Sequence, residues 1–246
     1  MKKMIFIIGT GRSGTHLIGR TVSSHPKIDG FIEHPNFFIL SALIGAFQDI
    51  APFSMETMLK KRLAKRYLKE LEQNPMDFVM DKSHANIWIA EYLAKKIPNS
   101  LFVGVYRDAL PTVSSMLKHK DVMRWYKILP QARKNRFLGI TDANKKSFRN
   151  FSIEEKCVQR WASHREELFR LRQVLPKDRY MLIKYEEFMN KPGEFLQELA
   201  SFIGIDNSFE YEKLEEESLD KWKSNLGKTQ IENVLIQVEL FENGIT

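Results

Sequence analysis

Residues 9–15, Gly-Thr-Gly-Arg-Ser-Gly-Thr, combine the backbone and side chains needed to hold an anion. Three glycines within six positions allow a tight turn in which backbone N–H groups converge on one charged group. The apolar run at 4–8 predicts a strand buried on both faces before the loop, and a helix is expected after it. Ser13 and Thr15 are expected to cap that helix, whose N-terminal dipole favours negative charge, and Arg12 adds a positive fork. The pattern indicates a phosphate or sulfate site.

The loop departs from the magnesium-ATP loop G-x-x-x-x-G-K-[ST] at its two most important positions. Counted from Gly9, that pattern requires lysine at 15 and Ser or Thr at 16. This chain has Thr15 and His16 there, and its positive charge lies earlier, at Arg12. Alone, the loop is also compatible with an ordinary glycine-rich turn between strand and helix. As an anion site the loop can bind phosphate, but it lacks the lysine and the hydroxyl residue with which such loops bind magnesium ATP.

Polar side chains that could take part in catalysis follow three other apolar runs. These are Glu33 after 28–32, Lys82 and His84 after 78–80, and Arg107 after 101–106. Ligands of open α/β sheets gather at the carboxyl ends of the strands, so these side chains are expected around one crevice. Ser115, on a helix predicted from about Pro111, could hold a second anion together with Arg107. Each residue taken singly is also compatible with a solvated surface group.

Apolar runs and helix breakers predict a regular alternation of strands and helices. Strands are expected at 4–8, 28–32, 78–80, 101–106 and 180–183. Helices are expected at 17–24, 38–47, 55–71, 87–96, 153–175 and 192–203. Two further helices are expected, one that begins at about 111 and one that follows 226 and ends at about 241. The basic stretch 118–150 is expected to be an irregular lid or acceptor loop. This order implies an α/β fold with a mostly parallel five-stranded sheet flanked by helices and right-handed crossovers.

The composition favours a single soluble domain covering residues 1–246. Hydrophobic residues make up 43% and charged residues 28%, and no Gly/Ser/Pro-rich linker divides the chain. The net charge of +7 suits anionic ligands, although a diffuse excess of lysine, as at 55–71, is more typical of a solvated surface. Zinc-type Cys/His clusters and RNA-binding aromatic patterns are missing, so nucleic acid is not an expected partner.

Targeting and redox signals point to a cytoplasmic protein. Cys157 is the single cysteine, which excludes an intrachain disulfide. The apolar run after Lys2-Lys3 is shorter than the core of a signal peptide, and no stretch is long enough to span a bilayer. We therefore expect a reducing compartment and no transmembrane segment.

The loop and the strand-end residues together resemble sulfotransferases that use 3′-phosphoadenosine 5′-phosphosulfate (PAPS). Residues 11–15 resemble the loop that binds the 5′-phosphosulfate, and the resemblance also implies a donor contact by His16. Tyr106-Arg107-Asp108, with Ser115 eight positions after the arginine, resembles the 3′-phosphate motif. In that family the arginine and the serine both contact the phosphate. Two further implied donor contacts are Tyr185, near the adenosine, and Lys221-Trp222, which would close over the donor.

The nearest likeness is to the tyrosylprotein and bacterial branch of these enzymes. That branch has the Arg-Ser-Gly-Thr loop, a His-Pro after the first helix, here His25-Pro26, and then a catalytic glutamate, here Glu33. Lys82 resembles the lysine of that branch and, with Arg12, would stabilise the leaving group. The segment Lys82-Ser83-His84 departs from this pattern, because it is similar to the Lys-x-His of cytosolic small-molecule sulfotransferases, whose histidine is the base. Spacing from the loop favours Glu33 as the base, with His84 as the alternative.

The resemblance implies a single P-loop NTPase-like domain that moves a sulfuryl group from PAPS to a hydroxyl or amine without a metal ion. The acceptor is left open as a small molecule, carbohydrate or peptide, since its specificity would lie in residues 37–75 and 118–150, where the resemblance is thin. Two alternatives stay open. One is a small-molecule kinase, against which the missing lysine counts, and the other is a non-catalytic nucleotide or polyanion binder.

Overall fold

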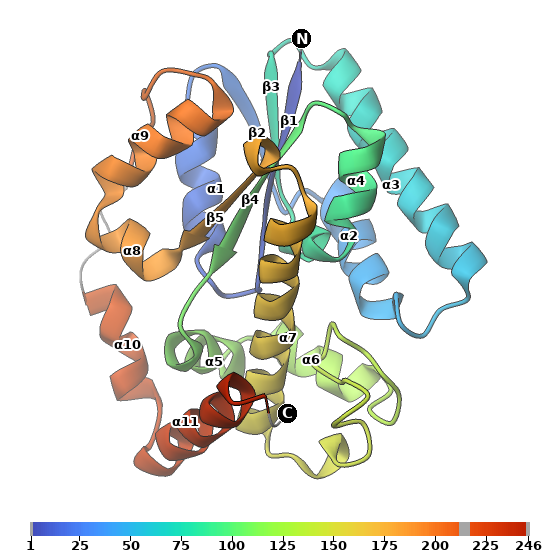
Figure 1. Cartoon of the computed structure of the whole chain (residues 1–246), viewed down its shortest axis with the longest axis vertical. Coiled ribbons are helices and arrows are strands. Elements are labelled where there is room, and N and C mark those ends of the chain that lie inside the picture. The colour runs from blue at the N-terminus through green and yellow to red at the C-terminus, as the bar shows by residue number, and fades with distance from the viewer. Residues whose placement is uncertain (1, 212–216, 245–246) are drawn as a thin grey trace.

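Strand β1, Lys3–Gly9, forms the centre of the fold because its side chains are apolar on both faces. The structure is a computed structural model that describes residues 2–211 and 217–244. In it β1 pairs with β3 on one side and with β4 on the other, and residues Met4 to Ile8 are completely buried. Such a strand must be covered by helices on both faces, and Figure 1 shows helices on both sides of the sheet.

All five strands of the described sheet are parallel. In sequence order they are β1, β2 (Ile28–Ile32), β3 (Phe78–Lys82), β4 (Ser100–Tyr106) and β5 (Tyr180–Lys184). Their order across the sheet is β2-β3-β1-β4-β5. The chain therefore reverses direction of winding at β1, and the loop after β1 lies at the switch point where ligands of such sheets bind. The predicted single α/β domain with a five-stranded sheet is confirmed.

Two apolar clusters cover the two faces of the sheet. Alternate side chains of β1 enter each cluster, so that Phe6 packs on one side and Ile7 on the other. The cluster around Ile7 is covered by α1 (Thr15–Ser23), α8 (Tyr185–Asn190) and α9 (Pro192–Ile203). The cluster around Phe6 is covered by α2 (Pro35–Phe47), α3 (Phe53–Gln73), α4 (Ala90–Lys96) and α7 (Ile153–Val174).

A further group of helices lies beyond the carboxyl ends of the strands, at the lower end of Figure 1. They are α5 (Ala109–Leu117), α6 (Lys120–Ile128), α10 (Glu217–Asn225) and α11 (Lys228–Glu242). Helix α5 contacts α6, α10 and α11. These helices surround the edge of the sheet where the polar loops emerge.

Three local predictions were wrong. Residues 118–150 are not wholly irregular, because α6 buries Val122 and Tyr126 one helical turn apart beneath its basic residues. The helix expected at 87–96 begins as a 3₁₀ turn, His84–Ile89, before α4. Ser13 and Thr15 do not cap α1: its N-cap is Gly14, without a side-chain cap.

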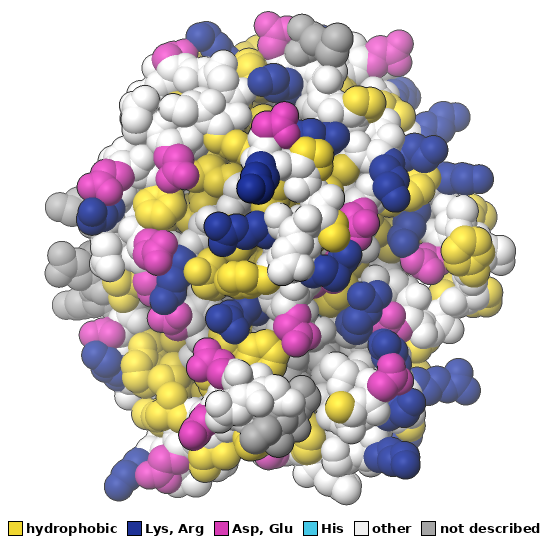
Figure 2. Space-filling view, in the orientation of Figure 1, with side chains coloured by type: hydrophobic (Ala, Val, Ile, Leu, Met, Phe, Trp, Pro, Cys, Tyr) yellow, Lys and Arg dark blue, Asp and Glu magenta, His cyan; other side chains and the backbone are white. Residues whose placement is uncertain are grey.

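Basic side chains form a stripe on the solvent-exposed face of α3. Figure 2 shows dark-blue side chains along the right-hand edge, over α3, with acidic side chains interspersed. The six basic residues of this stripe are Lys60, Lys61, Arg62, Lys65, Arg66 and Lys69, and none of them lines either cavity described below. The stripe is a solvated helix face, as its pattern favours. No helix in residues 2–211 and 217–244 has both the length and the hydropathy for a bilayer crossing.

Candidate active site

The loop after β1 is closed by its own serine. The Ser13 hydroxyl donates to Thr10 O, or alternatively to Val105 O, at 2.7 and 3.0 Å, and the side chain is fully buried. Gly14 has φ of +89°, and a Cβ atom there would lie 2.0 Å from the Tyr185 ring. Helix α1, which follows, has no side-chain cap and no acidic residue in its first turn. Its N-terminus is therefore suited to an anion from outside the helix.

Arg12 and Glu33 share an unusual backbone conformation. Their φ angles are 78° and 49°, and among the described residues they are the non-glycine positions with positive φ. The Glu33 N–H donates to Lys82 O at 3.0 Å, so the chain turns away just beyond its pairing with β3. Such conformations cost about 1–3 kcal/mol and persist where surrounding structure holds them, often at functional sites.

Four polar side chains meet at the carboxyl ends of β2 and β3. The Lys82 Nζ atom lies 2.5 Å from Oε1 of Glu33 and 2.9 Å from Nδ1 of His16. Nδ1 of His84 lies 3.2 Å from the same Glu33 oxygen, and Nε2 of His16 lies 3.5 Å from the other. The Lys82 side chain is only 1% exposed, whereas that of Glu33 is 27% exposed. Glu33 and His16, whose side chain is 45% exposed, are thus the members of the cluster that solvent reaches most.

The ionisation states in this cluster follow from burial and contact. Burial alone raises the pKa of Glu33, but hydrogen bonds from His16 and His84, together with the charges of His84 and Lys82, outweigh it and hold the pKa below its usual value. Burial lowers the pKa of His84 to about 4, although Glu33 opposes the shift. At neutral pH the Glu33 carboxylate is therefore ionised and the His84 imidazole is neutral. Burial also lowers the pKa of Lys82, against the opposing charge of Glu33.

A buried hydrogen-bond network centred on Asp81 holds the end of β3 in place. Asp81 accepts hydrogen bonds from the Tyr67 hydroxyl at 2.8 Å, from Asn86 Nδ2 at 3.0 Å and from the Ser83 hydroxyl at 3.1 Å. Burial raises the pKa of Asp81 to about 7, while the hydrogen bonds and the charge of Lys82 partly oppose it. The network fixes the strand that carries Lys82.

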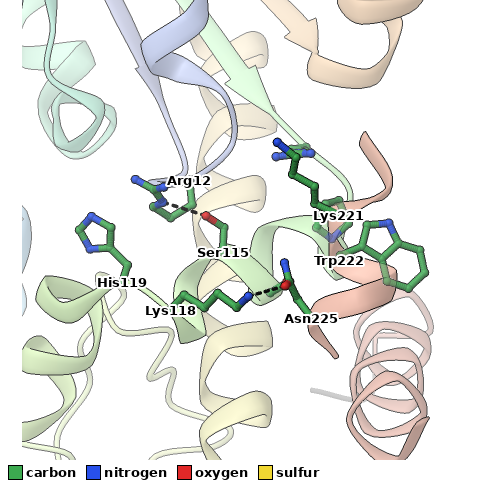
Figure 3. Close-up of a pocket in the computed structure, with 10 residues that line it drawn as sticks. Arg12, Ser115, Lys118, His119, Lys221, Trp222 and Asn225 are labelled. Atoms are coloured by element: carbon green, nitrogen blue, oxygen red, sulfur yellow. Dashed lines mark hydrogen bonds between the residues drawn. The ribbon is translucent and has the colours of Figure 1, made fainter. Parts of the chain in front are cut away.

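A basic cavity of about 310 Å³ lies on the other side of Arg12 (Figure 3). The Arg12 Nε–H donates to the Ser115 hydroxyl at 3.0 Å, and Lys118 donates to Asn225 Oδ1. Its lining residues come from the loop, the end of β4, α5 and α10: Arg12, Arg107, Pro111, Ser114, Ser115, Lys118, His119, Lys221, Trp222 and Asn225. Several cations around one small volume suit a doubly charged phosphate.

Arg107 is held in place by its neighbours. Its guanidinium carbon lies 4.5 Å from the centre of the Tyr185 ring, and its Nε lies 3.7 Å from a Glu186 oxygen. The Trp161 indole N–H donates to the Arg107 carbonyl at 2.8 Å. Burial lowers the pKa of Arg107, with the charges of Tyr185 and Glu186 opposing the shift. A pre-positioned, partly desolvated guanidinium can bind phosphate without reorganising.

The structure thus brings most of the expected site residues together. Tyr185 is 4% exposed and lines neither cavity, so its contacts are with Gly14 and Arg107. Ser13 uses its hydroxyl within the loop. Sequence reasoning missed Lys118 and His119, although both stand one helical turn from Ser115 and could have been found from that spacing.

A larger cavity of about 750 Å³ opens beside the Glu33 cluster. One end is polar and contains the loop, Glu33, Lys82 and His84. The apolar walls come from α2, with Phe38, Ile39, Ala42, Leu43 and Phe47, and from α6, with Val122, Trp125 and Ile128. Arg12 and His119 line both cavities, so the two join at the loop. The arrangement can hold an anionic ligand and a second molecule with their ends in contact.

The fold and this paired site define an α/β protein with an anion-binding loop between two ligand cavities. The chain belongs to the sulfotransferase family, whose sequence model matches residues 4–210. It is 22% identical over 213 residues to a protein-tyrosine sulfotransferase of Drosophila melanogaster, an alignment that covers 82% of this chain and 38% of that protein. This chain therefore spans well under half the length of that relative.

Solved structures agree in fold. The sulfotransferase domain of the Synechococcus PCC 7002 olefin synthase is similar with a TM-score of 0.61 and 13% identity, over 100% of this chain and 95% of that one. A sulfotransferase from Alicyclobacillus acidocaldarius is similar with a TM-score of 0.58 and 15% identity, over 100% and 96%. The expected family and its P-loop-like sulfotransferase fold are confirmed.

Proposed function

We propose that this chain transfers a sulfuryl group from PAPS to a hydroxyl of an acceptor, or to an amine. The observation that carries the proposal is the junction of two chemically different cavities at Arg12, with Glu33 and Lys82 beside it. A donor in the basic cavity and an acceptor in the larger one would meet beside a carboxylate and an ammonium group. Group transfer requires this close, aligned placement of the two reactants.

The basic cavity has the groups that PAPS requires. Arg107 and Ser115 would hold the 3′-phosphate, while Arg12 and the N-terminus of α1 would hold the phosphosulfate. Lys221 and Trp222 on α10 line the same cavity and would cover the nucleotide (Figure 3). The donor supplies the sulfuryl group, and these residues orient it toward Glu33.

Glu33 is proposed as the general base. Its carboxylate is ionised at neutral pH, faces the larger cavity and could accept the proton of an acceptor hydroxyl. Lys82 and Arg12 would stabilise negative charge on the phosphate that leaves. Lys82 now contacts Glu33 and His16, and a phosphate oxygen would compete with these two partners for its N–H groups. Withdrawal of that cation would remove one of the causes that lower the pKa of Glu33, while the larger contributions from the hydrogen bonds of His16 and His84 remain.

His84 is the second candidate for the base. Its low pKa leaves it neutral, and Nδ1–H can donate to Glu33 while Nε2 keeps a lone pair. In that arrangement Glu33 would orient the imidazole instead of taking the proton. The substitutions Glu33→Gln and His84→Ala distinguish the two candidates by their effects on turnover.

Donor turnover tests the proposal. The purified chain is supplied with PAPS or with ATP and a range of alcohols, and the nucleotide products are separated by chromatography. Formation of adenosine 3′,5′-bisphosphate is expected. ADP from ATP would establish a kinase, and nucleotide binding without any product would establish a binding protein.

A further inference from the structure

The walls of the larger cavity are apolar, whereas the end that contains Glu33, Lys82 and His84 is polar. Beyond the Glu33 cluster, α2 contributes only apolar side chains, and its sequence Pro35–Phe47 contains no charged residue. Phe38 lies next to the cluster, with its ring centre 5.5 Å from that of His84. The acceptor group therefore reacts at the edge of an apolar surface.

This apolar surface continues to the outside of the molecule. Ile39 on α2 and Ile128 on α6 both line the cavity, and each is 56% exposed. From Phe38 to Phe47 the wall is about 13 Å long at a rise of 1.5 Å per residue. Exposed apolar side chains that ring a cavity mark the entry of an apolar ligand.

Charge in the walls gives little hold to an acidic or strongly polar acceptor. Among the described residues of the α6 wall, the charged ones are Asp121 and Arg124, which are exposed and of opposite sign. Arg160 lines the cavity but is buried; it donates to Phe137 O at 2.6 Å, and its guanidinium carbon lies 4.1 Å from the Phe137 ring centre. The cation thus contacts the residue that forms the wall beside it, and its Nε has no hydrogen-bond partner among the described residues.

We infer that the acceptor is an alcohol with an extended hydrocarbon body, whose hydroxyl reaches Glu33 while its chain lies between α2 and α6. This inference rests on the proposed function and adds the acceptor class. The hydroxyl loses its proton to the base at the Glu33–His84 pair, and its oxygen forms a bond to the donor sulfur. The bond from that sulfur to the bridging oxygen breaks, and adenosine 3′,5′-bisphosphate leaves with the electron pair.

A series of straight-chain primary alcohols from butanol to decanol tests the inference. With PAPS as donor, kcat/KM is expected to rise by about fourfold for each methylene that the walls bury. A tyrosine peptide flanked by glutamates and a disaccharide serve as polar acceptors and should be poor substrates. A flat dependence on chain length, or a preference for the peptide or the sugar, would overturn the inference.

Paired leucine substitutions locate the effect. Leu43→Gln places an amide in the α2 wall, and Leu235→Gln is the control on α11, away from both cavities; the residues are 38% and 50% exposed. Leu43→Gln should lower kcat/KM for decanol by about tenfold or more and flatten the chain-length series. Leu235→Gln should change neither. Equal behaviour of the two variants would contradict the assignment.

Failure of the inference can be told apart from failure of the proposed function. If the chain neither binds adenosine 3′,5′-bisphosphate nor forms it from PAPS, the function itself is wrong. If peptide or sugar yields product and the alcohols do not, only the acceptor class is wrong. If no acceptor reacts although the nucleotide binds, calorimetric titration of decanol into the nucleotide complex decides, and absence of binding overturns the inference.

Discussion

Lys82 and Glu33 form a contact of 2.5 Å between a nearly buried ammonium group and a carboxylate that lines the larger cavity. Each is the nearest opposite charge to the other, and the Glu33 backbone is held in a positive-φ turn by its hydrogen bond to the Lys82 carbonyl. The contact holds the lysine in place, and the charge of Lys82 adds to the hydrogen bonds from His16 and His84 that lower the pKa of Glu33. If PAPS binds as proposed, its phosphosulfate would offer Lys82 a second anion and weaken the contact with Glu33.

The first prediction concerns the identity of the base. Glu33→Gln should reduce turnover by about 10²–10⁴-fold and leave affinity for adenosine 3′,5′-bisphosphate nearly unchanged, because the amide cannot take a proton. His84→Ala should reduce turnover much less. Steady-state rates and calorimetric nucleotide binding measure the two effects. The reverse ranking would assign the proton transfer to His84.

A fold control is needed because Glu33→Gln leaves the buried Lys82 without its carboxylate. Thermal unfolding of each variant with and without the nucleotide shows whether the site is still formed. A variant that gains as much stability from the nucleotide as the native chain has an intact donor cavity.

The second prediction concerns Arg107 and Ser115. The native chain should bind adenosine 3′,5′-bisphosphate more tightly than 5′-AMP by roughly two orders of magnitude, because removing one partner of a desolvated charge pair costs about 2–5 kcal/mol. Arg107→Ala should erase most of that preference by weakening only the bisphosphate. Ser115→Ala should erase a smaller part and also release the Arg12 guanidinium, which donates to Ser115.

Titration of both nucleotides against the three proteins gives the answer. Equal affinity of the native chain for the two nucleotides would remove the 3′-phosphate site and with it the main support for PAPS as donor.

The third prediction is that turnover does not need a metal ion. His16 stands where a magnesium-ATP loop has its hydroxyl residue, and His16 instead contacts Lys82 and Glu33. Activity with PAPS should survive excess EDTA. Complete loss that magnesium restores would favour kinase chemistry.

Much of the sheet and of the candidate site could be predicted from the sequence, since short apolar runs place Glu33, Lys82 and Arg107 at strand ends. The larger cavity with its apolar walls could not be predicted. One wall is formed by α6, which lies in a stretch so rich in basic residues that its apolar helical face is not evident from the sequence. Only the packing of α6 against the rest of the fold shows which side is buried. The role of Ser13 was also hidden, because its hydrogen bond to Val105 O joins residues 92 positions apart.

The fourth prediction concerns the packing of the loop. Gly14→Ala should destabilise the fold by about 1–3 kcal/mol or more, because φ of +89° disfavours a side chain and the new Cβ would overlap the Tyr185 ring. Gly193→Ala in α9 is the matched control, since a Cβ there meets nothing within 4 Å. It should leave stability unchanged or raise it by about 0.4–1 kcal/mol. Chemical denaturation compares the two, and equal effects would mean that the loop tolerates a side chain.

The last prediction concerns Asp81, whose burial raises its pKa from the ordinary 3.8 to about 7. Between pH of about 4 and about 7 the folded chain holds a proton that the unfolded chain has released, so the free energy of unfolding should fall as pH rises through this window. Asp81→Asn removes the titrating group and should flatten that dependence. The control is Asp77→Asn, an exposed carboxylate just before the same strand, which should leave the slope unchanged.

The slope is the informative quantity, because an amide at 81 changes the hydrogen bond to Ser83 and so alters stability at every pH. Tyr67 and Asn86 both donate to Oδ2 of Asp81, and Ser83 donates to Oδ1, so the NH₂ group of an asparagine would face the Ser83 hydroxyl, which must turn to accept. Urea denaturation from pH 4 to pH 8 therefore compares each protein with itself. If the native chain and Asp81→Asn show the same slope, Asp81 is ionised in the folded state, and Lys82 then lies on a strand that carries a buried charge.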